Sequence, residues 1–209
     1  MIKNGLKPKF YDDLDLSFAK AWEVIEPGVA KRSSPAHTPV VATVGHHGEP
    51  QLRVMVLRAA DRPARLLRFH TDVRSTKIGE LSERNEASVL MYDPELKLQL
   101  RLAGSMSIAT EGNDVDCAWL GSTTFARRCY LAEHAPGTLT ADATSGLPAW
   151  IEGKQPEEDQ LENARANFAL LYFEVRSLEW LYLANIGHRR AKWKWDDVTA
   201  KWSGRWLVP

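Results

Sequence analysis

The chain has few cysteines, no long hydrophobic run and no excess of charge of one sign. Its only cysteines are Cys117 and Cys129, whose spacing does not suit a zinc site and which we interpret as ordinary cytosolic thiols. No apolar stretch approaches the roughly 20 residues of a membrane span, and the first residues, MIKNGLKPKFYDDLDL, lack the apolar core of a secretion signal. We therefore expect a cytoplasmic protein with no membrane contact and no bound metal.

The 27 Lys and Arg residues balance 27 Asp and Glu residues, which argues against nucleic-acid binding because that function needs a basic face. The motifs G-x-G-x-x-G and G-x-x-x-x-G-K-[ST] are absent and helices do not alternate with strands, so a doubly wound nucleotide fold is not expected. With 44% hydrophobic and 26% charged residues, a chain of 209 residues fits one globular domain.

Hydrophobic residues at helical spacing predict an N-terminal helix, capped by Asp12 or Asp13 and ended by Pro27-Gly28. Short apolar segments between turn residues predict strands at Val40–Val44, Leu52–Arg58, Leu66–Thr71, Ala87–Tyr92, Leu96–Leu102, Ser105–Ile108, Phe168–Val175, Glu179–Leu183, Ala191–Trp195 and Trp202–Pro209. The break between the fifth and sixth of these is expected at Gly104. Because neighbouring strands are joined by short turns, we predict antiparallel pairing and a mainly β barrel with helices outside.

Two further helical segments are expected among the strands. One is short and capped by Ser75, and the other covers Asn113–Leu131 as one or two helices, with Trp119 and Phe125 on apolar faces. Residues 132–157 are rich in Pro, Gly, Ala and Thr and are predicted to form a long loop, which in a compact domain is usually functional or mobile.

The stretch from Arg53 to Lys77 concentrates positive charge, with seven cationic side chains and two acidic ones. Its loop Arg74-Ser75-Thr76-Lys77 places short hydroxyl side chains between two cations, just where a helix is expected to begin. Cations, hydroxyls and a helix start together suit a phosphate dianion. The alternative is that the arginines simply solvate a hairpin, which explains scattered charges better than it explains this loop.

The pattern RVMVLR, then RFHTD-x-RSTKIGEL, then a polar-faced strand containing Gln99, resembles the pyridoxamine 5′-phosphate oxidase-like FMN-binding split barrels. The ending HRRAKWKW…W…RWLVP is similar to the closing hairpin of that family. The segment Ala118-Trp119…Ala126-Arg127-Arg128-Cys-Tyr130…Pro136-Gly137 is more similar to its uncharacterised FMN-binding branch than to the true oxidases. This resemblance spans roughly residues 38–209 and implies an antiparallel split β-barrel.

The resemblance implies FMN as cofactor and a set of residues that contact it. In the family an arginine and a Ser-x-Lys loop hold the flavin phosphate, a Tyr-Thr pair lies nearby, a glutamine approaches the flavin, and backbone groups line the ring. The corresponding cofactor-binding residues here are Arg53, Val54, Met55, Val56, Arg58, His70, Thr71, Ser75, Thr76, Lys77 and Gln99. Gln99 shares a strand face with Lys97 and Arg101, so the alternative for it is an ordinary solvated face.

The chain also departs from the family pattern. Thr76 stands where the family usually has an arginine, and Arg74 is a candidate to replace that guanidinium. Ala191 stands at the position of a histidine that binds pyridoxal phosphate in the true oxidases, and their phosphate-binding Tyr, Arg and Ser are not recognisable from Trp119 to Arg128. Which of Arg189, Arg190 and Lys192 reaches the flavin stays open, as do the roles of Arg127 and Arg128.

The sequence therefore predicts an FMN-binding flavoprotein, an oxidoreductase of unknown substrate with no assigned catalytic residue. The alternatives are a non-catalytic FMN-binding or carrier module and a genuine pyridoxamine 5′-phosphate oxidase. The resemblance implies a homodimer, for which the five tryptophans in the last thirty residues offer apolar surface, although a plain core explains them equally well. We expect a single domain over 1–209, with N-terminal helix and linker at 1–37, barrel strands at 38–110, helical insert and loop at 111–167 and C-terminal strands at 168–209.

Overall fold

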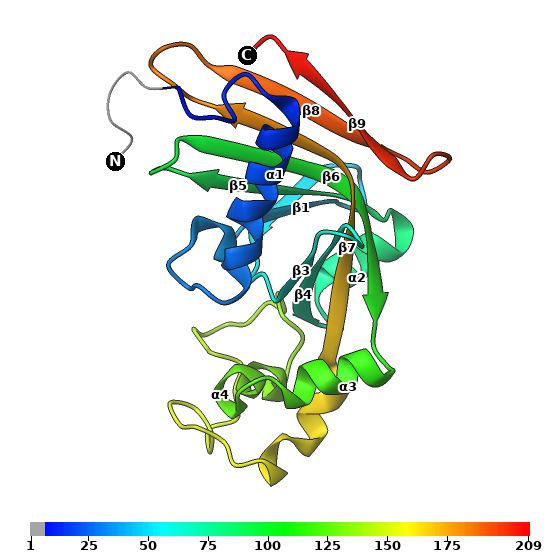
Figure 1. The fold of residues 1–209 in the computed structure, drawn as a ribbon. Helices are drawn as coiled ribbons and strands as arrows, with labels where there is room; N and C mark the ends of the chain where they lie inside the picture. The colour runs from blue at the N-terminus through cyan, green and yellow to red at the C-terminus, as the bar shows by residue number, and fades with distance from the viewer. Residues whose placement is uncertain (1–6) are drawn as a thin grey trace.

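The computed structural model describes residues 7–209 and contains one antiparallel sheet with helices around it (Figure 1). The strands are β1 (Val40–Val44), β2 (Pro50–Val54), β3 (Ala59–Asp61), β4 (Leu66–Asp72), β5 (Glu86–Asp93), β6 (Leu98–Ala109), β7 (Phe168–Tyr182), β8 (Arg189–Asp196) and β9 (Lys201–Leu207). Their order is β2-β1-β5-β6-β7-β4-β3, with β8 also paired to β7 and β9 to β8. The predicted antiparallel, mainly β architecture is confirmed, and the curled sheet is split rather than closed.

The helices are α1 (Leu14–Ile25), α2 (Thr76–Glu83), α3 (Asn113–Leu120) and α4 (Thr124–Arg127), and the 3-10 helices are η1 (Glu26–Val29), η2 (Pro35–His37), η3 (Arg128–Leu131) and η4 (Asp159–Asn167). Within residues 7–209, no helix is long and apolar enough to cross a membrane.

Helix α1 forms where its hydrophobic spacing predicted, and it packs against the sheet. Asp13 caps it by accepting a hydrogen bond from the Leu16 amide at 2.9 Å, which satisfies one of the free N–H groups of the first turn. Trp22 and Ile25 are fully buried in the main core between the helix and the strands. Pro27-Gly28 does not stop the helix at once, because the chain continues as the 3-10 turn η1.

The strand predicted at Leu52–Arg58 is shorter in the structure. β2 ends at Val54, and the Met55 amide donates to Pro39 O while the Arg58 amide donates to Arg68 O. The chain therefore leaves its pairing beside β1 and joins β4. This change of partner explains how Arg53 and Arg58, which strict alternation would put on opposite faces, both come to line one cavity.

Two predicted strand breaks are absent. β6 continues through Gly104 with a bulge between Ala103 and Gly104, where a Cβ would lie 1.8 Å from the Glu174 carbonyl oxygen. Glycine there permits close approach of two backbones and lets the strand bend. Likewise β7 is one strand of 15 residues rather than two. β7 runs the length of the molecule, from the helical insert to the end formed by β8 and β9 (Figure 1).

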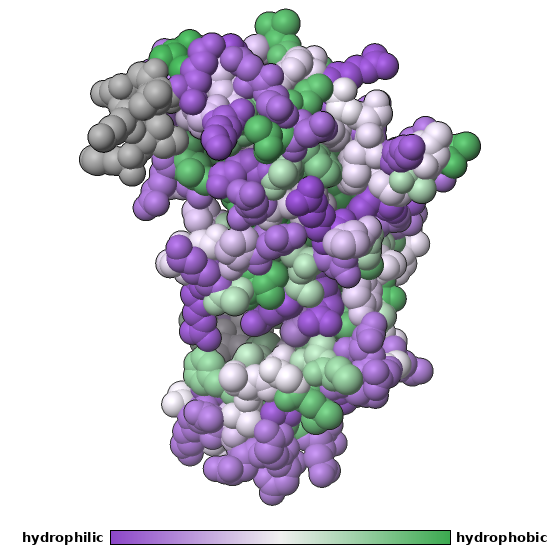
Figure 2. Space-filling view, viewed as in Figure 1, coloured by the Kyte–Doolittle hydropathy of each residue, from purple (hydrophilic) through white to green (hydrophobic). Residues whose placement is uncertain are grey.

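The helical insert has its own small core. This second hydrophobic cluster consists of Val115, Ala118, Trp119, Tyr130, Leu161, Ala164, Phe168 and Leu170. Phe125 was expected on an apolar face but is 59% exposed, with the Arg128 guanidinium 4.5 Å from its ring centre. Residues 132–157 contain no helix or strand, as predicted. In Figure 2 the tip of the insert is largely hydrophilic, and hydrophobic colour gathers where it meets the barrel.

The C-terminal tryptophans divide between core and surface. Trp180 and Trp193 are buried in the main core, whereas Trp206 is 39% exposed. Trp195 lies against the Arg65 guanidinium, with 3.7 Å between the guanidinium carbon and the ring centre. The core interpretation therefore accounts for part of the cluster and leaves Trp206 available at the surface.

Candidate functional site

A cavity of about 350 Å³ opens between the sheet and the helical insert, and this volume is typical of small-molecule sites. Its walls come from the end of β2 and the segment after it, from β4, from the start of α2, and from the insert. The lining residues are Arg53, Val54, Met55, Val56, Arg58, His70, Thr71, Asp72, Ser75, Lys77, Ala126, Cys129, Tyr130 and Pro136. Nine of the eleven residues predicted to bind the cofactor are thus brought together.

One corner of the cavity is a cluster of hydroxyl groups around a lysine. Lys77 Nζ donates to Ser75 Oγ at 2.9 Å and to Thr71 Oγ1 at 3.2 Å. Thr71 and Ser75 are buried, so their hydroxyls are fixed rather than solvated. Burial lowers the pKa of Lys77, and the nearby charge of Arg53 lowers it further. Two cations held this close in a partly dry site favour an anion between them.

Arg53 is anchored from behind by a buried carboxylate. Its guanidinium lies 3.0 Å from Glu80 Oε2, and Thr43 contacts both groups through its hydroxyl. Glu80 is buried because α2 turns it toward the sheet together with Leu81. Asp72 also lines the cavity, but its carboxylate is paired with Arg74 at 2.7 Å. The cations Arg53, Lys77 and Arg74 therefore outnumber the acids Glu80 and Asp72, and the corner keeps a positive excess.

Ser75 occupies the predicted N-cap position of α2, but its hydroxyl makes no capping bond there. Instead Ser75 Oγ donates to the Asp72 carbonyl oxygen at 2.7 Å. The expectation that Arg74 replaces the missing family arginine is not met. Its guanidinium pairs with the Asp72 carboxylate at 2.7 Å, and Arg74 does not line the cavity.

His70 lies on β4 in the cavity wall, with its ring edge-on to Phe168 at a centroid distance of 4.9 Å. Its Nε2 atom is buried and has no hydrogen-bond partner among residues 7–209. Burial, followed by the charges of Arg58 and Arg68, lowers the pKa of His70 to about 3. The imidazole is therefore neutral at ordinary pH, and its Nε2 atom is a buried polar group without a partner.

Two predicted cofactor residues lie outside this cavity. Thr76 is exposed as the first residue of α2. Gln99 is half-buried on β6, on the strand face that also carries Arg101, whose guanidinium donates to Glu179 at 3.2 Å. Neither residue reaches the cavity of its own chain.

Sequence reasoning missed the part of the wall that the insert supplies. The sequence pattern around Ala126, Cys129, Tyr130 and Pro136 indicated only a similarity to one branch of the family, and these residues were assigned no role in binding. Burial raises the pKa of the Cys129 thiol, and the carboxylate of Asp72 raises it further, which does not favour a reactive thiolate.

Comparison with known proteins agrees with this geometry. Residues 19–110 match the family model described as "Pyridoxamine 5'-phosphate oxidase, FMN-binding domain". Residues 19–110 form an FMN-binding domain of this oxidase family. Its cofactor is FMN.

A curated relative is the pyridoxine/pyridoxamine 5'-phosphate oxidase of Chromohalobacter salexigens, 26% identical over 193 residues that cover 83% of this chain and 80% of the relative. At this identity the FMN-binding domain is distant from the true oxidases.

Two solved structures show the same fold. The pyridoxamine 5'-phosphate oxidase-related, FMN-binding protein of Nostoc punctiforme superposes with a TM-score of 0.70 at 22% identity, covering 91% of this chain and 96% of that one. PhzG of Burkholderia lata, solved in complex with tetrahydrophenazine-1-carboxylic acid, has a TM-score of 0.70 at 21% identity, with 98% of each chain covered.

The residues of the FMN-binding domain fit the chemistry of this cofactor. The corner with Arg53 and Lys77 offers cations and hydroxyls of the kind that bind a phosphate dianion. Val54, Met55 and Val56 offer apolar surface and backbone groups to a planar ring.

Proposed function

We propose that this protein is an FMN-dependent oxidoreductase whose cavity between barrel and insert holds the flavin. Arg53, Ser75 and Lys77 bind the phosphate, with Thr71 orienting Lys77. The observation that carries the assignment is the positive excess of this corner, where Arg53 and Lys77 converge, Glu80 offsets only part of their charge, and the second acid, Asp72, is paired with Arg74.

The remaining lining residues position the ring in this proposal. Val54, Met55 and Val56 form one wall, while His70 and Arg58 supply polar contacts at its edge. When bound, FMN supplies hydride or electron transfer, and the protein supplies orientation and electrostatics. No residue is assigned as a general acid or base, because burial holds the imidazole of His70 neutral and raises the pKa of the Tyr130 phenol.

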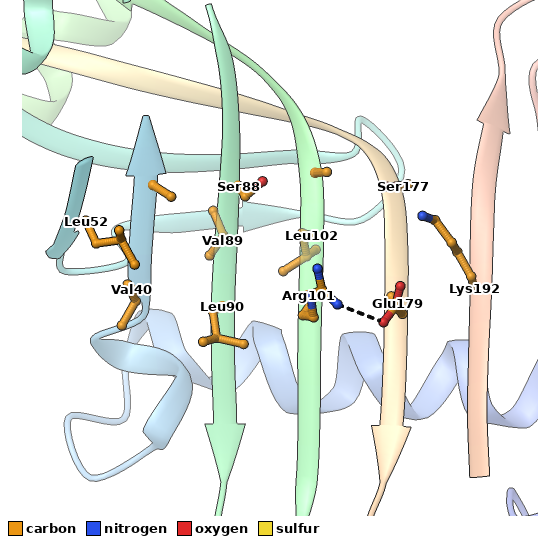
Figure 3. Close-up of a pocket in the computed structure, with 12 residues that line it drawn as sticks. Val40, Leu52, Ser88, Val89, Leu90, Arg101, Leu102, Ser177, Glu179 and Lys192 are labelled. Carbon is orange, nitrogen blue, oxygen red and sulfur yellow. Dashed lines mark hydrogen bonds and ion pairs between the residues drawn. The ribbon is translucent and has the colours of Figure 1, made fainter. Parts of the chain in front are cut away.

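We assign Thr76 to the phosphate side through its place at the start of α2, and Gln99 to the flavin of a second copy of the chain. Gln99 lies on a sheet face that no helix of the described chain covers; α1 lies behind the sheet in Figure 3. Large hydrophobic side chains are exposed on this face: Leu52 at 62%, Val54 at 63%, Leu90 at 38% and Tyr92 at 47%.

We name this apolar surface, formed by Leu52, Val54, Leu90 and Tyr92, the open sheet face. Charged residues lie beside it. Arg101 pairs with Glu179, and Lys192 lies on the next strand (Figure 3). Arg190 also pairs with Glu179, at 2.8 Å. An apolar centre with a charged rim is the usual composition of a subunit interface. A homodimer formed through this face would bury Val54, which also borders the cavity, and would carry Gln99 to the partner's flavin.

We further propose that the chain works as a single domain, because β7 contributes side chains to both hydrophobic clusters. The physiological substrate is not assigned. A non-catalytic FMN-binding module is the second candidate, and Ala191 favours it: this residue is fully buried opposite Trp180, so the substrate-binding histidine of the true oxidases has no counterpart here.

The experiment that tests the proposal is a flavin-retention assay with a redox step. Purified protein mixed with FMN, FAD or riboflavin and passed through a desalting column should retain FMN and lose riboflavin, which lacks the phosphate. Bleaching of the bound flavin by NADH or NADPH, and its recovery in air, would support an oxidoreductase. Retention without bleaching by any donor tested would favour the binding module, and loss of FMN would overturn both.

A further inference from the structure

A second part of the cavity wall is chemically different from the phosphate corner. It is lined by Arg58 and by four residues of the insert: Ala126, Cys129, Tyr130 and Pro136. Apart from the guanidinium, the thiol and the phenol, these side chains are small or apolar. A ligand that enters here meets one cation and an otherwise unreactive wall.

Arg58 is an unpaired charge. Its side chain is exposed and makes no ion pair or hydrogen bond within the described chain, while its backbone amide is held by Arg68 O at 2.8 Å. Arg58 lines the same cavity as His70, Cys129 and Tyr130. An unpaired arginine that lines a cavity is well suited to meet a carboxylate.

The two arginines of the insert, Arg127 and Arg128, do not line the cavity beside Arg58. Arg127 is buried, donates to Glu158 at 2.6 Å and lies against the Trp119 ring. Arg128 donates to the Lys154 carbonyl oxygen and lies over Phe125. Neither residue lines the cavity, so the insert end offers a single positive charge.

Tyr130 supplies a second polar group. Its ring is buried against Trp119 and Phe168, with centroid distances of 5.8 and 5.2 Å. Its hydroxyl has no hydrogen-bond partner among residues 7–209. Burial raises the pKa of the phenol, so the group stays protonated and can donate.

We propose that Arg58 and Tyr130 form a carboxylate-binding subsite, and that the substrate of this protein is an organic monocarboxylate rather than a phosphate ester. The guanidinium binds the carboxylate through charge, and the phenol donates a hydrogen bond to the same group. His70, whose imidazole is neutral, lines the same cavity.

The preference for one negative charge follows from the number of cations. A phosphate monoester carries about two charges at neutral pH, and binding it with one guanidinium would leave much of that charge desolvated without compensation. One carboxylate against one guanidinium is balanced. The inference rests on the proposed function, because FMN must occupy the Arg53–Lys77 corner for the Arg58 end to be the substrate side.

The test compares two probes that differ in their acidic group, benzoate and phenyl phosphate. Each is titrated into FMN-loaded protein and followed by ligand-observed NMR, which needs no turnover. We expect benzoate to bind more tightly than phenyl phosphate. Tyr130→Phe should weaken benzoate by about 3- to 10-fold and Arg58→Gln by about 10- to 100-fold, as loss of a neutral and of a charged hydrogen bond implies. Arg128→Gln, a matched change outside the cavity, should have no effect.

Phenyl phosphate binding as tightly as benzoate, or benzoate binding unchanged in both variants, would overturn the subsite. Flavin absorbance of each sample is recorded separately, so a wild-type protein that fails to hold FMN counts against the proposed function alone. The benzoate titration is then run on flavin-free protein, where Tyr130→Phe must still weaken binding. If Arg58→Gln does not fold, Tyr130→Phe decides.

Discussion

Arg53 and Glu80 form an ion pair, 3.0 Å between guanidinium and carboxylate, in which the acid is buried and the base reaches the cavity. The pair places a cation at the ligand while its counter-charge stays in the protein interior. Two elements distant in sequence, β2 and α2, are thereby fixed relative to each other.

Glu80→Ala should destabilise the protein by about 3 kcal/mol, because the buried Thr43 hydroxyl loses its acceptor and the Arg53 guanidinium loses its counter-charge. Urea unfolding of the flavin-free protein measures this. Glu83→Ala is the control: Glu83 is the last residue of the same helix, pairs only with exposed His46, and its loss should change stability by less than about 1 kcal/mol. Equal effects of the two substitutions would contradict a structural role for the buried pair.

The double variant Arg53→Ala/Lys77→Ala should bind FMN more weakly by about 2–5 kcal/mol, since it loses charge-assisted bonds to the phosphate. Equilibrium titration of flavin fluorescence gives the affinity. Arg84→Ala/Lys201→Ala removes the same charge from exposed sites outside the cavity and should leave affinity unchanged. An unaltered affinity in the first variant would refute the assignment of the phosphate corner.

Dimer formation and FMN retention should be linked, because a ligand bound only by the assembled state stabilises that state. Leu90→Glu puts a charge in the open sheet face and should yield a monomer that loses FMN on dilution. Val198→Glu alters a residue that is 94% exposed in the turn before β9 and should change neither property. Sedimentation velocity with detection of flavin absorbance measures the oligomeric state and the bound FMN in one experiment. A monomer holding stoichiometric FMN would disprove the link.

Pyridoxamine 5′-phosphate should not be turned over at an ordinary enzymatic rate. Ala191 is packed opposite Trp180 in the core, and the insert presents no free cation to a substrate phosphate. Hydrogen peroxide release by the FMN-loaded protein measures turnover, with a true oxidase as positive control. Turnover similar to that control would show that other residues replace the missing ligands.

His70 should make stability fall on acidification. The pKa of His70 is about 3 in the folded protein and 6.5 in the unfolded chain. Between these two pH values His70 is protonated in the unfolded chain and neutral in the folded protein. Its contribution to the free energy of unfolding is therefore complete above pH 6.5 and falls by about 1.4 kcal/mol per pH unit below it. Flavin-free wild type should therefore lose about 2 kcal/mol between about pH 7.5 and about pH 5 from this group.

His70→Gln removes the titrating ring, and unfolding curves at both pH values should show that much less acid sensitivity. His47→Gln, at an exposed position in the turn between β1 and β2, should behave as wild type. An acid sensitivity that survives in His70→Gln would locate the effect elsewhere.

The sequence was sufficient wherever one local pattern decides the structure. The apolar period of α1, the strand Val40–Val44 and the Ser75–Lys77 loop all appear where predicted. The end of β2 was misjudged because residues 55–58 are apolar enough for a strand, and only the hydrogen bond from Arg58 to Arg68, ten residues away, shows that the chain changes partner.

Contacts across long separations were the main source of error. Gly104 reads as a strand breaker, but the close approach of Glu174 makes it a bulge inside one strand. Tyr130 carries no motif, and its place in the cavity depends on the packing of the insert against Phe168. Gln99 was assigned to the flavin by resemblance, and the fold of one chain cannot bring it to its own cavity.

The central position of β7 also sets the order in which the molecule can be made. The hairpin of β3 and β4, which carries His70 and Thr71, is attached to the remaining strands only through β7 within the described sheet. A nascent chain that has not yet reached Phe168 therefore holds two unconnected pieces of sheet, whose pairing partners lie far apart in sequence. The cofactor can therefore bind only late in synthesis. Until β7 has been made, β4 and β6 each have one edge without a hydrogen-bonded neighbour.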